Sequence, residues 1–147
     1  MPGELFFRAA QPRDWDSVAM LLADAQLPLD GAEAHLADFI LAVEGDRLVG
    51  AVGWERYGNH ALLRSLVVSP ELRGQRVGIA LVNALLARAR AEQLATLVLL
   101  TETAADFFRR FGFRPIERGA APAAVTASAE FQGACPLSAI VMQLDFT

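Results

Sequence analysis

The stretch "SLVVSPELRGQRVGIALVNALL", residues 65–86, decides the fold. Its apolar strand ends at Ser69-Pro70, because the residue before a proline is held extended and proline has no N–H to give to a neighbouring strand. A turn with two arginines follows and leads into an apolar helix, which we predict over residues 75–92. The first N–H groups of a helix are unpaired and carry partial positive charge, so phosphate is their natural partner. We weigh pyrophosphate binding here against a plain turn with solvated arginines.

Strands and helices follow one another on both sides of this stretch. Strand patterns cover residues 5–9, 61–68, 96–100, 113–118 and 138–146, and residues 39–54 read as a hairpin that turns at Gly45-Asp46. Helices are predicted between residues 12 and 27, within 30–38 and over 104–110, with a short one inside the loop 119–136. The order predicts a mixed α/β (α+β) fold with a mainly antiparallel, twisted sheet of six to seven strands, flanked by about four helices.

Composition narrows the class of protein. The chain has 147 residues, is 54 % hydrophobic and 20 % charged, and is predicted to be one globular domain over 1–147. No apolar run is long enough to span a membrane, and the N-terminus lacks the pattern of a signal peptide, so we expect a cytoplasmic protein. A net charge of −4 without a basic run argues against nucleic-acid binding. There is no lysine, which excludes Schiff-base chemistry and a lysine base.

The stretch 65–86, followed by a strand and then by "AADFFRRFGF" (104–113), resembles the GCN5-related N-acetyltransferase (GNAT) superfamily over nearly the whole chain. The resemblance implies acetyl-CoA as co-substrate, no metal, and direct transfer in an opening where the fourth and fifth strands splay. The cofactor-binding residues that it implies are Leu66, Val67, Val68, Arg73, Gly74, Gln75, Arg76, Val77, Gly78, Ile79, Ala80, Thr101, Phe107 and Phe108.

Two positions depart from the pattern of that superfamily. Arg76 occupies the first glycine position of the Arg/Gln-x-x-Gly-x-Gly/Ala motif, although its backbone amide is still present. Phe108 stands where many relatives carry the tyrosine that protonates the departing CoA thiolate, and phenylalanine has no proton to give. Water or another residue then supplies the proton, or the thiolate leaves unassisted.

Acetyl transfer to an amine requires a base for the ammonium proton and donors for the tetrahedral oxyanion. The resemblance points to a backbone N–H near Val67 as that donor. Glu55 is our candidate base or water-positioning group, against a plain strand-end carboxylate, and His60 is a weaker one. Arg64 and the catalytic candidate Ser65 border the opening, and strand alternation predicts that one of the two faces the substrate. Arg64 is either a carboxylate anchor or part of a structural ion pair.

The C-terminal half carries two narrower resemblances. "LVLLTETAADFFRRFGF" (97–113) is similar to the acetyltransferase domain of N-acetylglutamate synthases. The C-terminal half, roughly residues 62–142 and including the stretch 117–142, is similar to arsenic-resistance N-acetyltransferases. Both imply a glutamate-like acceptor, including an organoarsenical amino acid. Thr103 and Phe131 are our further substrate candidates, although Thr103 also suits a helix N-cap. Cys135 reads more simply as a small buried hydrophobe than as an arsenic site.

Rival functions use the same residues. One is acetyl transfer to a polyamine or a peptide N-terminus. The other is a non-catalytic acyl-CoA sensor, which Phe108 and Arg76 favour. The oligomeric state stays open, with a homodimer through the exposed edge of a final strand as one arrangement.

Overall fold

The computed structural model describes residues 4–146, and residues 1–3 and 147 lie outside it. The prediction that the N-terminus is no signal peptide concerns in part these first three residues. Seven strands form one sheet in the order β1-β2-β3-β4-β5-β7-β6. Their bounds are β1 Leu5–Ala9, β2 Ile40–Glu44, β3 Arg47–Tyr57, β4 His60–Val68, β5 Thr96–Thr101, β6 Arg114–Ile116 and β7 Ile140–Asp145. All neighbours are antiparallel except β4 and β5, which are parallel. The predicted mixed sheet is confirmed.

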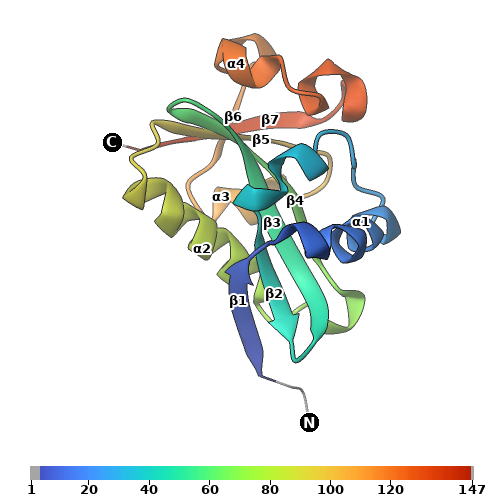
Figure 1. Ribbon diagram of the computed structural model, residues 1–147. Coiled ribbons are helices and arrows are strands. Elements are labelled where there is room, and N and C mark those ends of the chain that lie inside the picture. The colour runs from blue at the N-terminus through green and yellow to red at the C-terminus, as the bar shows by residue number, and fades with distance from the viewer. Residues whose placement is uncertain (1–3, 147) are drawn as a thin grey trace.

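The helices flank this sheet, with α1 and α2 on its opposite sides (Figure 1). They are α1 Trp15–Asp24, α2 Val77–Ala91, α3 Ala105–Arg109 and α4 Ala123–Thr126, together with the 3-10 helices η1 Pro12–Asp14, η2 Glu33–Asp38, η3 Pro70–Leu72 and η4 Arg118–Ala120 and a π-type turn, η5 Glu130–Ala134. Figure 1 shows α4 and η5 above β6 and β7, at one end of the sheet. No helix within residues 4–146 is long and apolar enough to cross a membrane.

Apolar side chains fill both sides of the sheet. One cluster under α2 includes Trp54, Leu81 and Leu97, and a second under α1 includes Leu22 and Phe39, all without exposed surface. Burying each such side chain stabilises the fold by about 1.5–3 kcal/mol. A third cluster ties the segment with α4 and η5 to the sheet, so that this segment is held in a fixed place beside β4 and β5.

The parallel strands β4 and β5 separate along their length. They pair only at His60, Ala61 and Leu62 of β4, which face Thr96, Leu97 and Val98 of β5. Beyond these positions β4 continues to Val68 and β5 to Thr101 without pairing with each other. The predicted splay of the fourth and fifth strands is therefore present.

A β-bulge in β4 lies where the splay opens. Ala51 faces Val67 and Gly53 faces Arg64, so that Ser65 and Leu66 share one partner position on β3. Ser65 has a φ of 63°, in the left-handed region. This extra residue breaks the period of two on which strand alternation rests. The prediction that Arg64 and Ser65 face opposite sides is therefore wrong, and both line the same cavity.

Gly53 on β3 is required by close packing. A Cβ at this position would lie 2.1 Å from Cδ1 of Phe39, whose ring is fully buried. We expect Gly53→Ala to lower the free energy of unfolding by about 1–3 kcal/mol through overpacking. Urea unfolding measures this loss. Gly119→Ala is the matched control, because nothing lies within 4 Å of its Cβ position, and an equal loss in both variants would contradict the packing argument.

The last strand in sequence is not an edge of the sheet. β7 lies between β5 and β6, and the edge on that side is β6, which has three residues and contains Pro115. A short edge with a proline offers few N–H groups for pairing with another sheet. The homodimer stays a prediction, and the short edge strand β6 has few backbone groups for pairing with a second sheet.

Candidate functional site

A cavity of about 500 Å³ lies where β4 and β5 separate, and we call it the acceptor cavity. Its walls come from β4, β5, the loop before η2 and the segment around η5. The residues that line it are Gln26, Leu27, Pro28, Leu63, Arg64, Ser65, Leu66, Leu99, Leu100, Thr101, Glu102, Thr103, Ala104, Phe108, Glu130, Ala134, Cys135, Pro136 and Ala139. Arg64, Ser65, Leu66, Thr101, Thr103 and Phe108 of the predicted site thus come together here.

A second hollow of about 410 Å³ lies at the start of α2, and we call it the α2 pocket. It is lined by Val68, Leu72, Arg73, Gly74, Arg76, Val77, Gly78, Ile79, Phe107 and Arg110. Most of the predicted pyrophosphate residues meet here, whereas Gln75 and Ala80 are not among the lining residues. Arg110 was missed, although it lies three residues after Phe107 and so on the same helix face.

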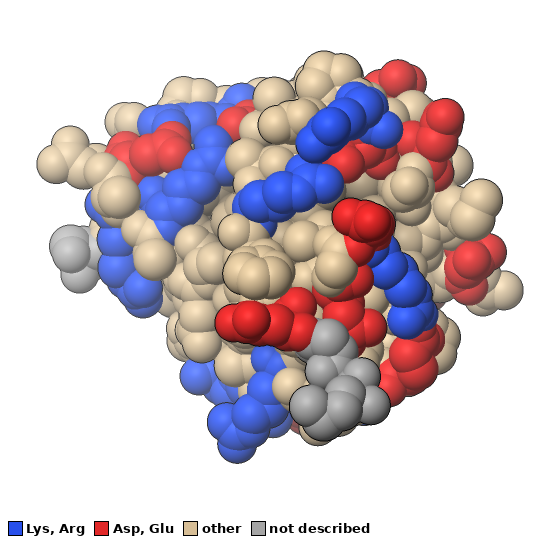
Figure 2. Space-filling view, turned by 60° about the horizontal axis from the view of Figure 1, so that its bottom comes forward, with Lys and Arg blue, Asp and Glu red and all other residues tan. Residues whose placement is uncertain are grey.

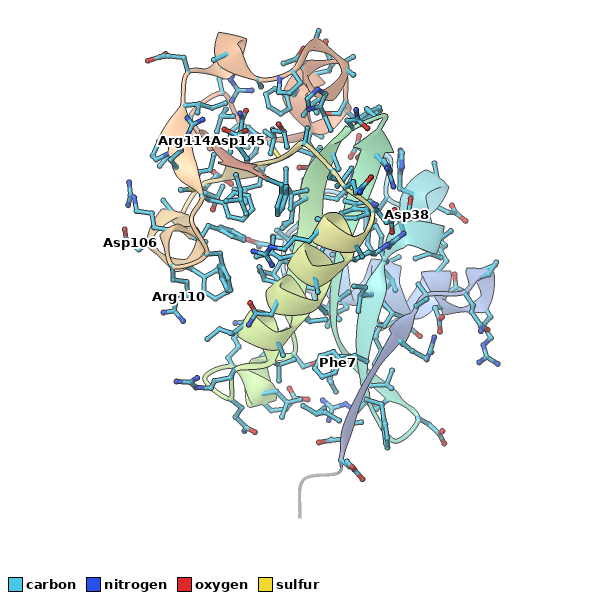
Figure 3. The ribbon with its side chains drawn as sticks, turned by 90° about the vertical axis from the view of Figure 1, so that its left-hand side faces the viewer. Phe7, Asp38, Asp106, Arg110, Arg114 and Asp145 are labelled. Carbon is cyan, nitrogen blue, oxygen red and sulfur yellow. The ribbon has the colours of Figure 1, made fainter. Side chains whose placement is uncertain are left out.

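Three arginines give the α2 pocket its charge. Arg73 and Arg76 come from the turn before α2, and Arg110 directly follows α3, where its guanidinium lies 5.3 Å from the centre of the Phe107 ring. Figure 3 shows Arg110 and Asp106 leaving α3 in different directions. On the face seen in Figure 2, basic and acidic side chains are interspersed. The three guanidinium groups and the free N–H groups at the start of α2 are the donors that this pocket offers to an anion.

The start of α2 is set by backbone conformation. Arg76 is the N-cap with φ 67°, ψ 14°, and α2 therefore begins at Val77, two residues later than the sequence predicted. A side chain in this left-handed region costs about 1–2 kcal/mol that glycine does not pay.

We expect Arg76→Gly to raise the free energy of unfolding by about 1 kcal/mol, because it removes this backbone strain. Arg76→Ala keeps the Cβ and is the control in which no gain is expected. Urea midpoints of the two variants check this, and an equal gain in both would contradict the strain argument.

Backbone directions on β4 decide which amides face the opening. The Ser69 N–H donates to Val49 O at 2.8 Å, toward β3, and the Val68 carbonyl accepts from Arg73 Nε at 3.4 Å, on the other side. Since these directions alternate over residues 67–69, the backbone of Val67 faces β3 and that of Val68 faces the opening, while Leu66 belongs to the bulge. Val67 pairs with Ala51 of β3, and this pairing corrects the expectation that the Val67 N–H is free to serve as the oxyanion donor.

Arg64 is fully buried and held by five groups. Its Nη1 donates to Asp30 O and Glu55 Oε2, both at 2.6 Å, and its Nη2 donates to Pro28 O at 3.0 Å. Its Nε donates to Ser65 Oγ at 3.1 Å and lies 3.4 Å from Glu130 Oε2. A guanidinium has five N–H groups, so Arg64 has little left for a ligand. This geometry corrects the prediction that Arg64 anchors a carboxylate of the substrate. Arg64 instead forms structural ion pairs with Glu55 and Glu130 in the wall of the cavity.

Glu55 is buried behind the wall of the acceptor cavity, whereas a catalytic base must reach the amine in the cavity. It is 2 % exposed, does not line the acceptor cavity, and accepts hydrogen bonds from Arg64 and from the Tyr57 hydroxyl. Burial and the bond to Glu55 raise the pKa of Tyr57 well above its usual value. His35 Nε2 lies 3.6 Å from Glu55 Oε1. The prediction of Glu55 as base is therefore corrected, because its carboxylate is spent on holding Arg64.

Glu130 and Cys135, together with the exposed Glu102, are titratable residues of the acceptor cavity that our site prediction did not include. Glu130 is 4 % exposed, and its pKa is raised mainly by burial. The half-buried Cys135 thiol has its pKa raised to about 12 by burial and by Glu130. Glu130 and Cys135 both lie in the segment 119–136, which we predicted as a loop with a short helix. A single charged residue, Glu130, in this alanine-rich stretch was the signal that could have pointed to the site.

Thr101, Thr103 and Phe131 differ from their predicted roles. The Thr101 hydroxyl accepts the Ala104 N–H at 2.9 Å, so that Thr101 rather than Thr103 satisfies a free donor at the start of α3. Thr103 is exposed and lines the acceptor cavity. Phe131 does not line it and packs in the third apolar cluster, with the Arg118 guanidinium 5.4 Å from its ring centre. The prediction that Phe131 contacts the substrate is therefore corrected, because its side chain instead fixes the segment with α4 and η5 to the sheet.

These features define a domain that can hold an elongated anionic ligand along one strand edge and lead it to a small-molecule cavity. The family model of the acetyltransferase (GNAT) domain matches residues 35–115. The match covers more than half of the chain, and the chain belongs to this family. No curated protein matches it significantly in sequence.

Solved structures share the fold. N-acetylglutamate synthase from Neisseria gonorrhoeae, complexed with coenzyme A and N-acetyl-glutamate, has a TM-score of 0.83 at 17 % identity over 100 % of this chain and 36 % of that chain. Rv2747 from Mycobacterium tuberculosis, in complex with CoA, has a TM-score of 0.81 at 24 % identity over 97 % and 99 %. A GNAT-family acetyltransferase from Staphylococcus aureus Mu50 has a TM-score of 0.81 at 17 % identity, over 98 % of this chain and 100 % of that chain. The chain thus spans about a third of the Neisseria protein, and these likenesses establish the fold.

Proposed function

We propose that this chain is an acetyl-CoA-dependent N-acetyltransferase that acts on a small molecule with a primary amine. One observation carries the proposal: the open edge of β4 runs from the α2 pocket, which Val68 lines, to the acceptor cavity, which Leu66 lines. A ligand with a pyrophosphate at one end and a thioester at the other fits that path. The two neighbours that bind CoA, from Neisseria and Mycobacterium, support the same co-substrate.

Each part of acetyl-CoA has a partner in this arrangement. The pyrophosphate takes the free N–H groups at the start of α2 and the guanidinium groups of Arg73, Arg76 and Arg110. The pantetheine arm pairs with the backbone of Val68, and the thioester oxygen accepts the Leu66 N–H, which stabilises the oxyanion. The amine attacks the acetyl carbon directly. Phe108 lines the cavity without a proton to give, so the thiolate takes its proton from the attacking nitrogen.

The acceptor class follows from the charges around the cavity. A glutamate-like acceptor, including an organoarsenical amino acid, is the finer proposal that the sequence resemblances support. Its carboxylates would require free donors, and Arg64 is occupied. Among residues 4–146, Arg64 is the one cationic residue in the lining of the acceptor cavity. We therefore place amines without a carboxylate ahead of amino acids.

Release of the CoA thiol from acetyl-CoA tests the function. The panel holds glutamate, its arsenical and phosphinic analogues, methionine, spermidine, simple alkylamines and a short peptide. We expect release with one or more amines, together with the acetylated product by mass spectrometry. Acetyl-CoA binding without release on any of these amines would instead identify a binding module, which is the reading that Phe108 favours.

A further inference from the structure

The buried cluster beside the acceptor cavity holds two glutamates and one arginine, and the imidazole of His35 contacts Glu55 rather than Glu130. Arg64 is its one guanidinium, and it lies 2.6 Å from Glu55 and 3.4 Å from Glu130. Both carboxylates are almost fully buried. Glu55 makes the shorter contact with Arg64 and so balances its charge. It also accepts a hydrogen bond from the Tyr57 hydroxyl. Glu130 shares this guanidinium at the longer distance, and a buried carboxylate whose charge is only partly compensated is costly.

The position of Glu130 shows where a compensating charge can come from. Its side chain lines the acceptor cavity, whereas Glu55 does not. Asp30 and Glu55 add negative charge around Glu130, Arg64 opposes them, and Cys135 is close enough to interact with the carboxylate. A cation that enters the cavity can supply the positive charge that this cluster lacks.

We propose that Glu130 receives the ammonium group of the acceptor amine and takes up its proton as the general base. This inference rests on the proposed function, and it assigns the residue that makes the amine nucleophilic. The base then comes from the segment between β6 and β7, which is also the segment that walls the acceptor cavity.

The proton balance is complete within this assignment. One proton passes from the ammonium nitrogen to the Glu130 carboxylate, and the freed lone pair attacks the acetyl carbonyl carbon. A C–N bond forms and the carbonyl becomes an oxyanion. The C–S bond then breaks as the carbonyl re-forms, and the nitrogen gives its second proton to the CoA thiolate. Glu130 returns its proton to solvent after the amide leaves.

The environment of Glu130 suits a base. Burial raises its pKa, and Glu55 and Asp30 act in the same direction, against Arg64 and the Cys135 hydrogen bond. A carboxyl group with a raised pKa accepts a proton more readily near neutral pH than an exposed one does. Activity should rise with pH as Glu130 loses its proton, with a midpoint above the usual value for glutamate.

Cys135, the single cysteine, provides a test that does not depend on knowing the acceptor. It lines the same cavity, so that methanethiosulfonates of opposite charge can serve as probes of the charge around its thiol. We expect the wild type to favour the cationic aminoethyl reagent over the anionic sulfonatoethyl reagent by about tenfold relative to free cysteine, because of the Glu130 carboxylate. Glu130→Gln should remove most of this preference. Its effect on the pKa of the thiol cancels in the ratio of the two rates.

Glu102→Gln is the matched control, because Glu102 lines the cavity but is exposed and screened. We expect it to change the ratio by less than about threefold. A wild-type preference for the anionic reagent, or a ratio unchanged by Glu130→Gln, overturns the proposal.

Kinetics with an amine from the panel test the base role itself. Glu130→Gln should lower kcat/KM for the amine about 100-fold or more and abolish the rise of activity with pH, while the Kd for acetyl-CoA stays the same. A retained pH profile overturns the base role even where the reagent ratio has changed. Absence of turnover in the wild type contradicts the proposed function, and the reagent ratio then still decides whether Glu130 makes the cavity a cation site.

Discussion

Replacement of Arg64 by methionine is expected to lower the free energy of unfolding by about 3–5 kcal/mol. The side chain has no exposed surface, and its removal leaves both Glu55 and Glu130 buried without the guanidinium that they share. It also strands the carbonyl groups of Pro28 and Asp30, which fix the loop before η2. Each buried group that loses its donor adds to the cost. Urea unfolding at neutral pH measures the change.

Two further variants separate the charge effect from simple loss of packing. Arg109→Met removes an exposed arginine that is paired with Asp106, and its cost should stay below about 1 kcal/mol. Adding Glu55→Gln to Arg64→Met should restore part of the lost stability, because one orphaned charge is then neutral. A double variant less stable than Arg64→Met alone would show that the uncompensated carboxylates are not the cause.

Loss of the arginines at the α2 pocket is expected to weaken acetyl-CoA binding. A charge-assisted hydrogen bond contributes about 1.5–3 kcal/mol, so Arg73→Ala and Arg110→Ala should each raise the Kd about tenfold or more. The double variant should approach 100-fold if the two arginines act on separate phosphate oxygens. Calorimetric titration measures these values, and the wild-type affinity should fall as salt is added.

The controls for this prediction come from the neighbouring residue and from the ligand. Arg109 is next to Arg110 on α3 but does not line the α2 pocket, so Arg109→Ala should leave the Kd unchanged. S-acetyl-pantetheine has no pyrophosphate, and its binding should be the same in the wild type and in both arginine variants. Equal weakening with this truncated ligand would mean that the arginines support the fold rather than bind phosphate.

The fold and the turn that forms the α2 pocket could be predicted from the sequence, because both rest on local signals. Ser69-Pro70 ends β4, and the turn from Arg73 to Gly78 precedes an apolar helix, so that strand, turn and helix follow from adjacent residues. To predict Arg110 as a residue of the α2 pocket, one further argument was needed, namely its helical spacing of three residues from Phe107. That spacing was available in the sequence.

The acceptor side was harder to predict because tertiary contacts decide it. The bulge at Ser65 shifts the facing of β4 residues, and no local pattern announces it. Arg64 is saturated by groups from β3 and from the loop before η2, which lie far from it in sequence. Glu130 and Phe131 are adjacent, yet one lines the acceptor cavity and the other packs in the core. Only the π-type turn η5 determines which of them faces the cavity.

Amide hydrogen exchange at β4, followed by NMR with and without acetyl-CoA, tests the central claim most directly. The claim is that the cofactor pairs with the open edge of β4 between the α2 pocket and the acceptor cavity. We predict that acetyl-CoA slows exchange at Leu66 in the bulge and at Val68, which faces the opening, and leaves Val67, which faces β3, nearly unchanged. Saturating acetyl-CoA that protects none of these amides, or protects Val67 alone, would contradict the account.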